Sequence, residues 1–118
     1  MFKDDYIMRQ VETLAETVAH LVFQKKNADY QPGEVRSAAD DLYFELHTLV
    51  EQGQINEAEN RLYEGCDLND VQCLEVAVDF YAHLNNLSDK ELEAGGFSRE
   101  EIQEGLEDLL EQYGVSLK

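Results

Sequence analysis

The chain has no tryptophan, one proline and only two cysteines among its 118 residues. With one proline there is little to interrupt helices, and Glu, Leu, Ala and Gln, which favour helix, are abundant. No segment alternates between apolar and polar residues long enough to indicate a strand. Since 43% of the residues are hydrophobic and 30% are charged, the composition is that of a globular protein. We therefore expect an all-α fold, in one helical domain over residues 1–118.

Basic residues are scarce, and the shortage is uneven along the chain. Residues 1–36 contain six acids and five bases, whereas the remainder contains 20 acids against four bases, a net charge of −16. A body of that charge repels phosphate backbones and anionic lipid, so we expect no direct binding to nucleic acid and none to membrane surfaces. Solubility alone explains such a charge. A basic protein or peptide partner is the functional interpretation, and mimicry of a nucleic acid's charge is an alternative.

Long hydrophobic runs are also missing. The opening MFKDD has no signal-peptide hydrophobic region, and the longest apolar run is too short to span a bilayer. We therefore expect a cytoplasmic protein. In that compartment Cys66 and Cys73 are expected to remain free thiols, with Cys73 buried as a small apolar residue.

Apolar residues at helical spacing predict about five helices that pair as antiparallel hairpins. Gly53 is expected to end one helix, and Ser88 and Ser98, each followed three residues later by Glu, predict helix starts through capping boxes. Val35 is expected on the inward side of the second helix. The predicted helices cover about residues 4–26, 34–52, 56–64, 71–84 and 98–113, with a short helical turn opened by Ser88.

In the first predicted helix, apolar residues alternate steps of four and three, the spacing of a seam that packs against another helix. In a chain this short, such a seam usually packs inside its own domain. A homodimer through the first helix is the alternative, and it requires the seam to face outward. The seam consists of Ile7, Val11, Leu14, Val18 and Leu21.

The motif EQGQINEAE at residues 51–59 resembles the turn between the two helices of a tetratricopeptide repeat. Gly53 stands where the chain must reverse tightly, and Ala58 stands where the second helix must approach the first closely. The resemblance covers one repeat, residues 42–64, and Leu46 stands where the family's pattern has glycine. It implies a tetratricopeptide-like helical hairpin rather than a tandem array.

The opening segment DYIMRQ, residues 5–10, resembles a family of small bacterial proteins of unknown function whose members have a similar length. In outline the resemblance spans the whole chain. The family has no established activity, so the resemblance implies no catalytic residue, cofactor or partner.

Signatures of catalysis are absent from the sequence. It contains no GxGxxG, no phosphate-binding loop, no HExxH and no CxxC. Glu16 and His20 are four residues apart, as are Asp79 and His83, but ordinary pairing on a helix surface explains both. We therefore expect no cofactor, no metal and no catalytic residue. A metal-dependent or carboxylate-using enzyme built on a helical bundle is the alternative.

Aromatic residues give the sharpest functional hypothesis. Tyr43 and Phe44 are adjacent, so they cannot point in the same direction from one helix, and one of them is available to line a groove. A groove lined by tyrosines and edged by carboxylates suits a partner segment with basic and apolar residues. We expect a protein–protein interaction module, an adaptor or regulator. Its predicted partner-binding residues are Tyr43, Leu46, Arg61 and Tyr63.

Overall fold

A computed structural model describes residues 2–26, 28–67 and 70–114, and every regular element within them is an α-helix. The all-α prediction is thereby confirmed, and the turn opened by Ser88 is a short helix of its own. None of the helices in these ranges combines the length and apolar character needed to cross a membrane. The helices are α1 (Phe2–Leu21), α2 (Ala38–Glu51), α3 (Ile55–Gly65), α4 (Val71–Asn85), α5 (Asp89–Ala94) and α6 (Arg99–Gln112).

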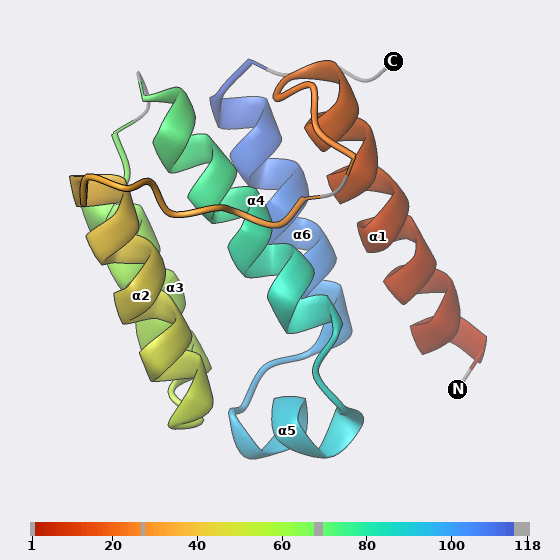
Figure 1. Cartoon of the computed structure of the whole chain (residues 1–118). Helices are drawn as coiled ribbons and strands as arrows, with labels where there is room; N and C mark the ends of the chain where they lie inside the picture. Colours follow the sequence, from red (N-terminus) through yellow and green to blue (C-terminus); the bar gives the residue numbers. More distant parts are fainter. Residues whose placement is uncertain (1, 27, 68–69, 115–118) are drawn as a thin grey trace.

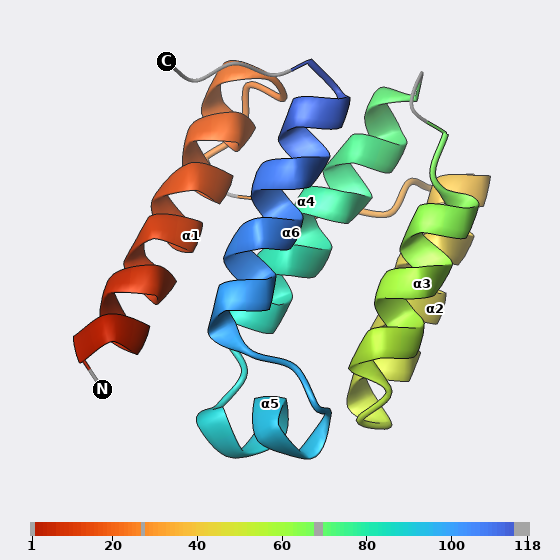
Figure 2. The same cartoon turned by 180° about the vertical axis from the view of Figure 1, so that it is seen from behind.

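Helix α4 occupies the middle of the fold and packs against α1, α2 and α6 (Figure 1). The hairpin of α2 and α3 lies on one side of it, α1 lies on the other, and α5 lies at one end. A connector, described over residues 22–26 and 28–37, runs from α1 across α4 to α2. The opposite face shows α6 in front of α4, without the connector crossing it (Figure 2). The two faces of the fold therefore differ in what covers α4.

Helix α1 is shorter than the predicted 4–26 because the backbone reverses after Leu21. Gln24 has a left-handed conformation with φ 56°, and the N–H of Lys25 donates back to the carbonyl of Ala19 at 2.9 Å. That local geometry closes the helix end, and the residues after it belong to the connector.

Helix α2 begins later than the predicted residue 34. Ser37 is its cap: the Ser37 hydroxyl accepts from the Asp40 N–H at 3.2 Å, and the Asp40 carboxylate accepts from the Ser37 N–H at 3.0 Å. This capping box starts the helix at Ala38. Val35 therefore lies in the connector, where it is 87% exposed, and the prediction that it faces inward was wrong.

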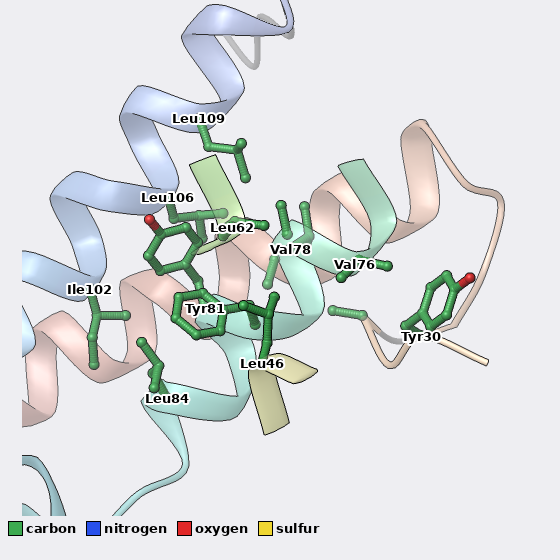
Figure 3. Packing of buried hydrophobic residues seen from close by; sticks show 14 of the residues in the cluster. Tyr30, Leu46, Leu62, Val76, Val78, Tyr81, Leu84, Ile102, Leu106 and Leu109 are labelled. Carbon is green, nitrogen blue, oxygen red and sulfur yellow. The ribbon is translucent and has the colours of Figure 1, made fainter. Parts of the chain in front are cut away.

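The core surrounds Tyr81 of α4, which is fully buried (Figure 3). Ile102 and Leu106 of α6 pack beside it, and Gly105 lies against its ring. The Tyr81 hydroxyl donates to the carboxylate of Glu59 in α3 at 2.7 Å, which satisfies the one polar group that burial would otherwise leave unpaired. Tyr81 thus ties α3, α4 and α6 together.

The seam of α1 turns mostly toward this core. Ile7, Val11 and Val18 are buried, and Leu14 is half-buried. Leu21, the last residue of the helix, is 68% exposed. A homodimer remains a prediction, and the three buried positions are not available to form it.

The expectation of two free thiols was wrong. Cys66 and Cys73 form a disulfide with their Cα atoms 5.6 Å apart. Cys66 follows the end of α3 and Cys73 lies in the first turn of α4, so a bond between cysteines seven residues apart ties the end of α3 to the start of α4. Cys73 is buried, as expected.

Replacing Gly105 with alanine is expected to destabilise the fold. A Cβ at this position would lie 2.5 Å from Cε1 of Tyr81, whose ring is held by its bond to Glu59. Overpacking of this kind costs about 1–3 kcal/mol, more than the roughly 1 kcal/mol that alanine gains over glycine in a helix. The free energy of unfolding in urea should fall, whereas Glu104→Ala, at the exposed neighbouring position, should leave it nearly unchanged. A Gly105→Ala variant as stable as the parent would contradict this packing.

Candidate functional site

The connector, α2 and α4 enclose a pocket of about 260 Å³, which we call the ring pocket. Residues 29–32 of its lining belong to the connector, which crosses α4 in Figure 1. Its walls are aromatic and imidazole rings together with carboxylates and amides, and none of its lining residues is Lys or Arg. The ring pocket is lined by Asp29, Tyr30, Gln31, Pro32, Tyr43, His47, Asp79, His83 and Asn86.

Asp79 joins the three walls of the ring pocket. It lies in α4 and is 6% exposed. Its Oδ1 accepts a hydrogen bond from the backbone N–H of Tyr30 at 3.0 Å, and its Oδ2 lies 3.0 Å from Nε2 of His47 in α2. A buried carboxylate is costly unless its oxygens are hydrogen-bonded, so both partners stabilise Asp79 in this position.

Tyr30 fixes the connector a second time. Its hydroxyl donates to Oδ1 of Asp40, in the first turn of α2, at 2.6 Å. Burial, followed by this bond to Asp40, raises the pKa of Tyr30 to about 12. The Tyr30 hydroxyl and the N–H of Ser37 in turn lower the pKa of the Asp40 carboxyl. The connector is therefore held to α2 by a side chain and to α4 by a backbone amide.

Four rings follow one another through the pocket. The ring centroids of Tyr30 and Tyr43 are 5.2 Å apart, those of Tyr43 and His47 are 4.4 Å apart, and those of His47 and His83 are 4.4 Å apart. Tyr43 and His47 are four residues apart on α2, as Asp79 and His83 are on α4, so each pair occupies one helix face. The packing of α2 against α4 places the two pairs together.

The ring pocket favours neutral imidazole at His83. Burial lowers the pKa of His83 below its ordinary value of 6.5, and the adjacent His47 lowers it further, whereas Asp79, Glu51 and Glu91 act in the opposite direction. Burial also raises the pKa of Tyr43. At neutral pH the pocket thus presents tyrosine rings and the neutral imidazole of His83 beside carboxylates, an arrangement suited to a cation with N–H donors.

Chemistry within this pocket is limited by its composition. His47 is oriented by Asp79, as an imidazole base can be, but the lining contains no Ser, Thr, Cys or Lys to act as a nucleophile. Across the part of the chain that the structure describes, no group of three or more His, Cys, Asp or Glu is arranged to hold a metal ion.

The predicted partner-binding residues lie in different surroundings. Tyr43 lines the ring pocket, whereas Leu46 is 1% exposed and belongs to the core. Arg61 is paired with Glu45, Nη2 to Oε2 at 3.0 Å, on the outside of the α2–α3 hairpin. Tyr63 is 43% exposed, with its hydroxyl 3.2 Å from that of Tyr81. Only Tyr43 of the four thus contributes to the ring pocket.

Sequence reasoning missed His47 and Tyr30 as members of a site. The sequence did contain one signal of the site: Tyr43 and His47 are four residues apart, as are Asp79 and His83, so each pair lies on one helix face. What brings the two faces together is a tertiary contact between α2 and α4. Tyr30 carried no such signal because it lies in an irregular connector.

Comparison with known proteins identifies a family and no activity. Residues 1–114 match the model of DUF6483, a family of unknown function. The chain belongs to this family, and the expected resemblance to a family of unknown function is confirmed. No curated protein and no solved structure matches the chain.

The lowered pKa of His83 predicts a stability that depends on pH. A histidine that is harder to protonate in the folded state stabilises the fold fully above its unfolded pKa, near 6.5, and loses that contribution as the pH falls through 6.5 toward the folded pKa. The urea midpoint should therefore decline on going from pH 7.5 to pH 5.5. In His83→Gln the decline should be smaller, because that group no longer takes up a proton on unfolding. Equal declines in both proteins would contradict the assignment, and NMR titration of His83 would show the pKa directly.

Proposed function

We propose that this member of a family of unknown function is a protein–protein interaction module, an adaptor or regulator that binds a basic segment of a partner protein. The observation that carries the proposal is the ring pocket, in which rings and carboxylates converge without any Lys or Arg. Tyr43, a predicted partner-binding residue, forms part of its wall. A partner's basic side chain is the occupant that this lining favours.

Long-range charge supports the same proposal. The chain carries a formal net charge of −17, so its field attracts basic partners and raises their rate of encounter. The connector beside the pocket is exposed over residues 31–36. An irregular surface segment held on a helical scaffold is a common place for binding residues. The partner would therefore meet the connector face first.

The helical hairpin beside the pocket supports an interaction role as well. Helices α2 and α3 meet through a turn in which Gly53 has φ 77°, and Ala58 is buried between helices. These are the two features that a tetratricopeptide-like hairpin requires. We include this likeness in the proposal, because such hairpins present fixed surfaces to partner proteins.

A bacterial cytoplasmic location is part of the proposal. The Cys66–Cys73 disulfide counts against this location, because a reducing compartment would tend to open that bond. The disulfide lies at the junction of α3 and α4, and neither cysteine lines the ring pocket. The proposed binding therefore does not require the bond.

Tyr43→Ala should abolish partner binding. Truncating an aromatic side chain at the centre of an interface costs about 2 kcal/mol or more, roughly a thirtyfold loss of affinity. The test is capture from a lysate of the source organism with the purified parent and variant, read by quantitative mass spectrometry. Circular dichroism of the variant should show unchanged helix content, since Tyr43 is only half-buried.

Tyr63→Ala is the matched comparison, because Tyr63 is also a predicted partner-binding residue but only Tyr43 lines the ring pocket to which the proposal assigns binding. Tyr63 is also a half-exposed tyrosine of the α2–α3 hairpin, but its hydroxyl faces Tyr81 and not the ring pocket. A protein retained by the parent and by Tyr63→Ala, but lost with Tyr43→Ala, is the expected result. Retention of every captured protein by Tyr43→Ala would show that the ring pocket is the wrong surface.

A further inference from the structure

The ring pocket is specific enough to indicate which basic side chain it holds. Resting on the proposed function, we infer that the occupant is the guanidinium group of an arginine from the partner protein. The inference depends on the size of the pocket, on the acceptors that face it and on the rings that line it. The size favours a single side chain, the acceptors favour a cation over a neutral group, and the rings favour arginine over lysine.

The size of the pocket suits a single side chain. Its volume of about 260 Å³ lies below the roughly 300–1,000 Å³ of sites that enclose drug-sized ligands. The connector closes one side through Tyr30, whose backbone and hydroxyl are both bonded to the helices beneath. A slot with a fixed wall favours an extended side chain entering end-on.

Carboxylate and amide oxygens supply hydrogen-bond acceptors in the lining. Asp29 and Asp79 offer carboxylate oxygens, and Gln31 and Asn86 offer amide oxygens. Each oxygen of Asp79 already has one partner, and a carboxylate oxygen can accept a second hydrogen bond. Asp29 likewise has a contact within the chain. A guanidinium, with five N–H donors and no acceptor, complements this set.

The rings distinguish arginine from lysine. Tyr43, His47 and His83 follow one another at centroid distances of 4.4 Å, so the pocket presents a series of ring edges and faces. A planar guanidinium stacks on such rings and is weakly hydrated, whereas an ammonium is a compact and strongly hydrated point charge. Entering a pocket this small strips water from the head group, and the loss is smaller for arginine.

A neutral imidazole at His83 is a condition of this binding. A proton on His83 would place a positive charge against the guanidinium, so affinity should fall in acid. Burial lowers the pKa of His83, which keeps that ring neutral at pH 7. The titratable groups around the two rings are Asp29 of the connector, Tyr43 and Glu51 of α2, Asp79 of α4 and Glu91 of α5.

The test is an NMR titration of the full chain with three small probes: the N-acetyl amides of arginine, lysine and citrulline. Citrulline has nearly the shape of arginine but carries no charge. Saturable shifts of the backbone amides of Tyr30, Tyr43 and His83 are expected with the arginine probe at pH 7.5, with a dissociation constant in the millimolar range. The lysine probe should bind at least about threefold more weakly, and the citrulline probe should cause no saturable shift.

The pH arm uses the same arginine probe at pH 5.5. Binding should weaken by at least roughly threefold in the parent, and by less in His83→Gln, where the protonation site at His83 is removed. Tyr43→Ala should lose binding at both pH values. An arginine probe without saturable shifts at pH 7.5, or a citrulline probe that binds equally well, would overturn the inference. Binding that strengthens in acid would overturn it too.

The outcome separates this inference from the proposed function. If the arginine probe fails to bind while Tyr43→Ala still loses a protein in the capture experiment, the guanidinium assignment is wrong and the interaction module stands. If the probe binds but no captured protein depends on Tyr43, the arginine site stands and the proposed role of the site fails.

Discussion

One buried carboxylate, that of Asp79, holds the connector and α2 against α4 where the ring pocket lies. Asp79 accepts from the backbone of Tyr30 and bonds to His47, so a single side chain of α4 holds both the connector and α2. Without those partners its burial would be unfavourable, and without Asp79 the backbone N–H of Tyr30 would lose its hydrogen bond to α4. The ring pocket exists because these three segments meet at one residue. The connector supplies Tyr30 to its lining, α2 supplies Tyr43 and His47, and α4 supplies His83.

The two faces of α4 are packed differently. On the face turned toward α3 and α6, Tyr81 packs against Gly105 and donates to Glu59, and that contact is close and buried. On the other face, the connector covers α4 without a regular element, and a pocket remains between them. The close helix-to-helix contacts thus lie on one face of α4, and the proposed binding would use the other. The excess of carboxylates over basic residues also attracts cations to the molecule.

The helices could be predicted from the sequence because their signals are local. Ser88 and Ser98 cap helices through boxes with Glu91 and Glu101, and the apolar spacing identified the buried side of each long helix. The pocket could not, because the contacts that build it join residues far apart: 49 positions separate Tyr30 from Asp79, and 32 separate His47 from Asp79. Val35 was misplaced for the opposite reason. Its local pattern continued the helix, but the Ser37 capping box started the helix after it.

Hydrogen exchange in an Asp79→Ala variant tests the central claim most directly. If Asp79 holds the connector, the amide of Tyr30 should exchange at least about tenfold faster, while amides in α6 such as that of Leu106 keep their protection relative to one another. The exposed Asp108→Ala is the control, and it should change neither. Unchanged protection at Tyr30 would contradict the account. A uniform loss of protection throughout the chain would contradict it as well, because Asp79 would then support the whole fold rather than the ring pocket.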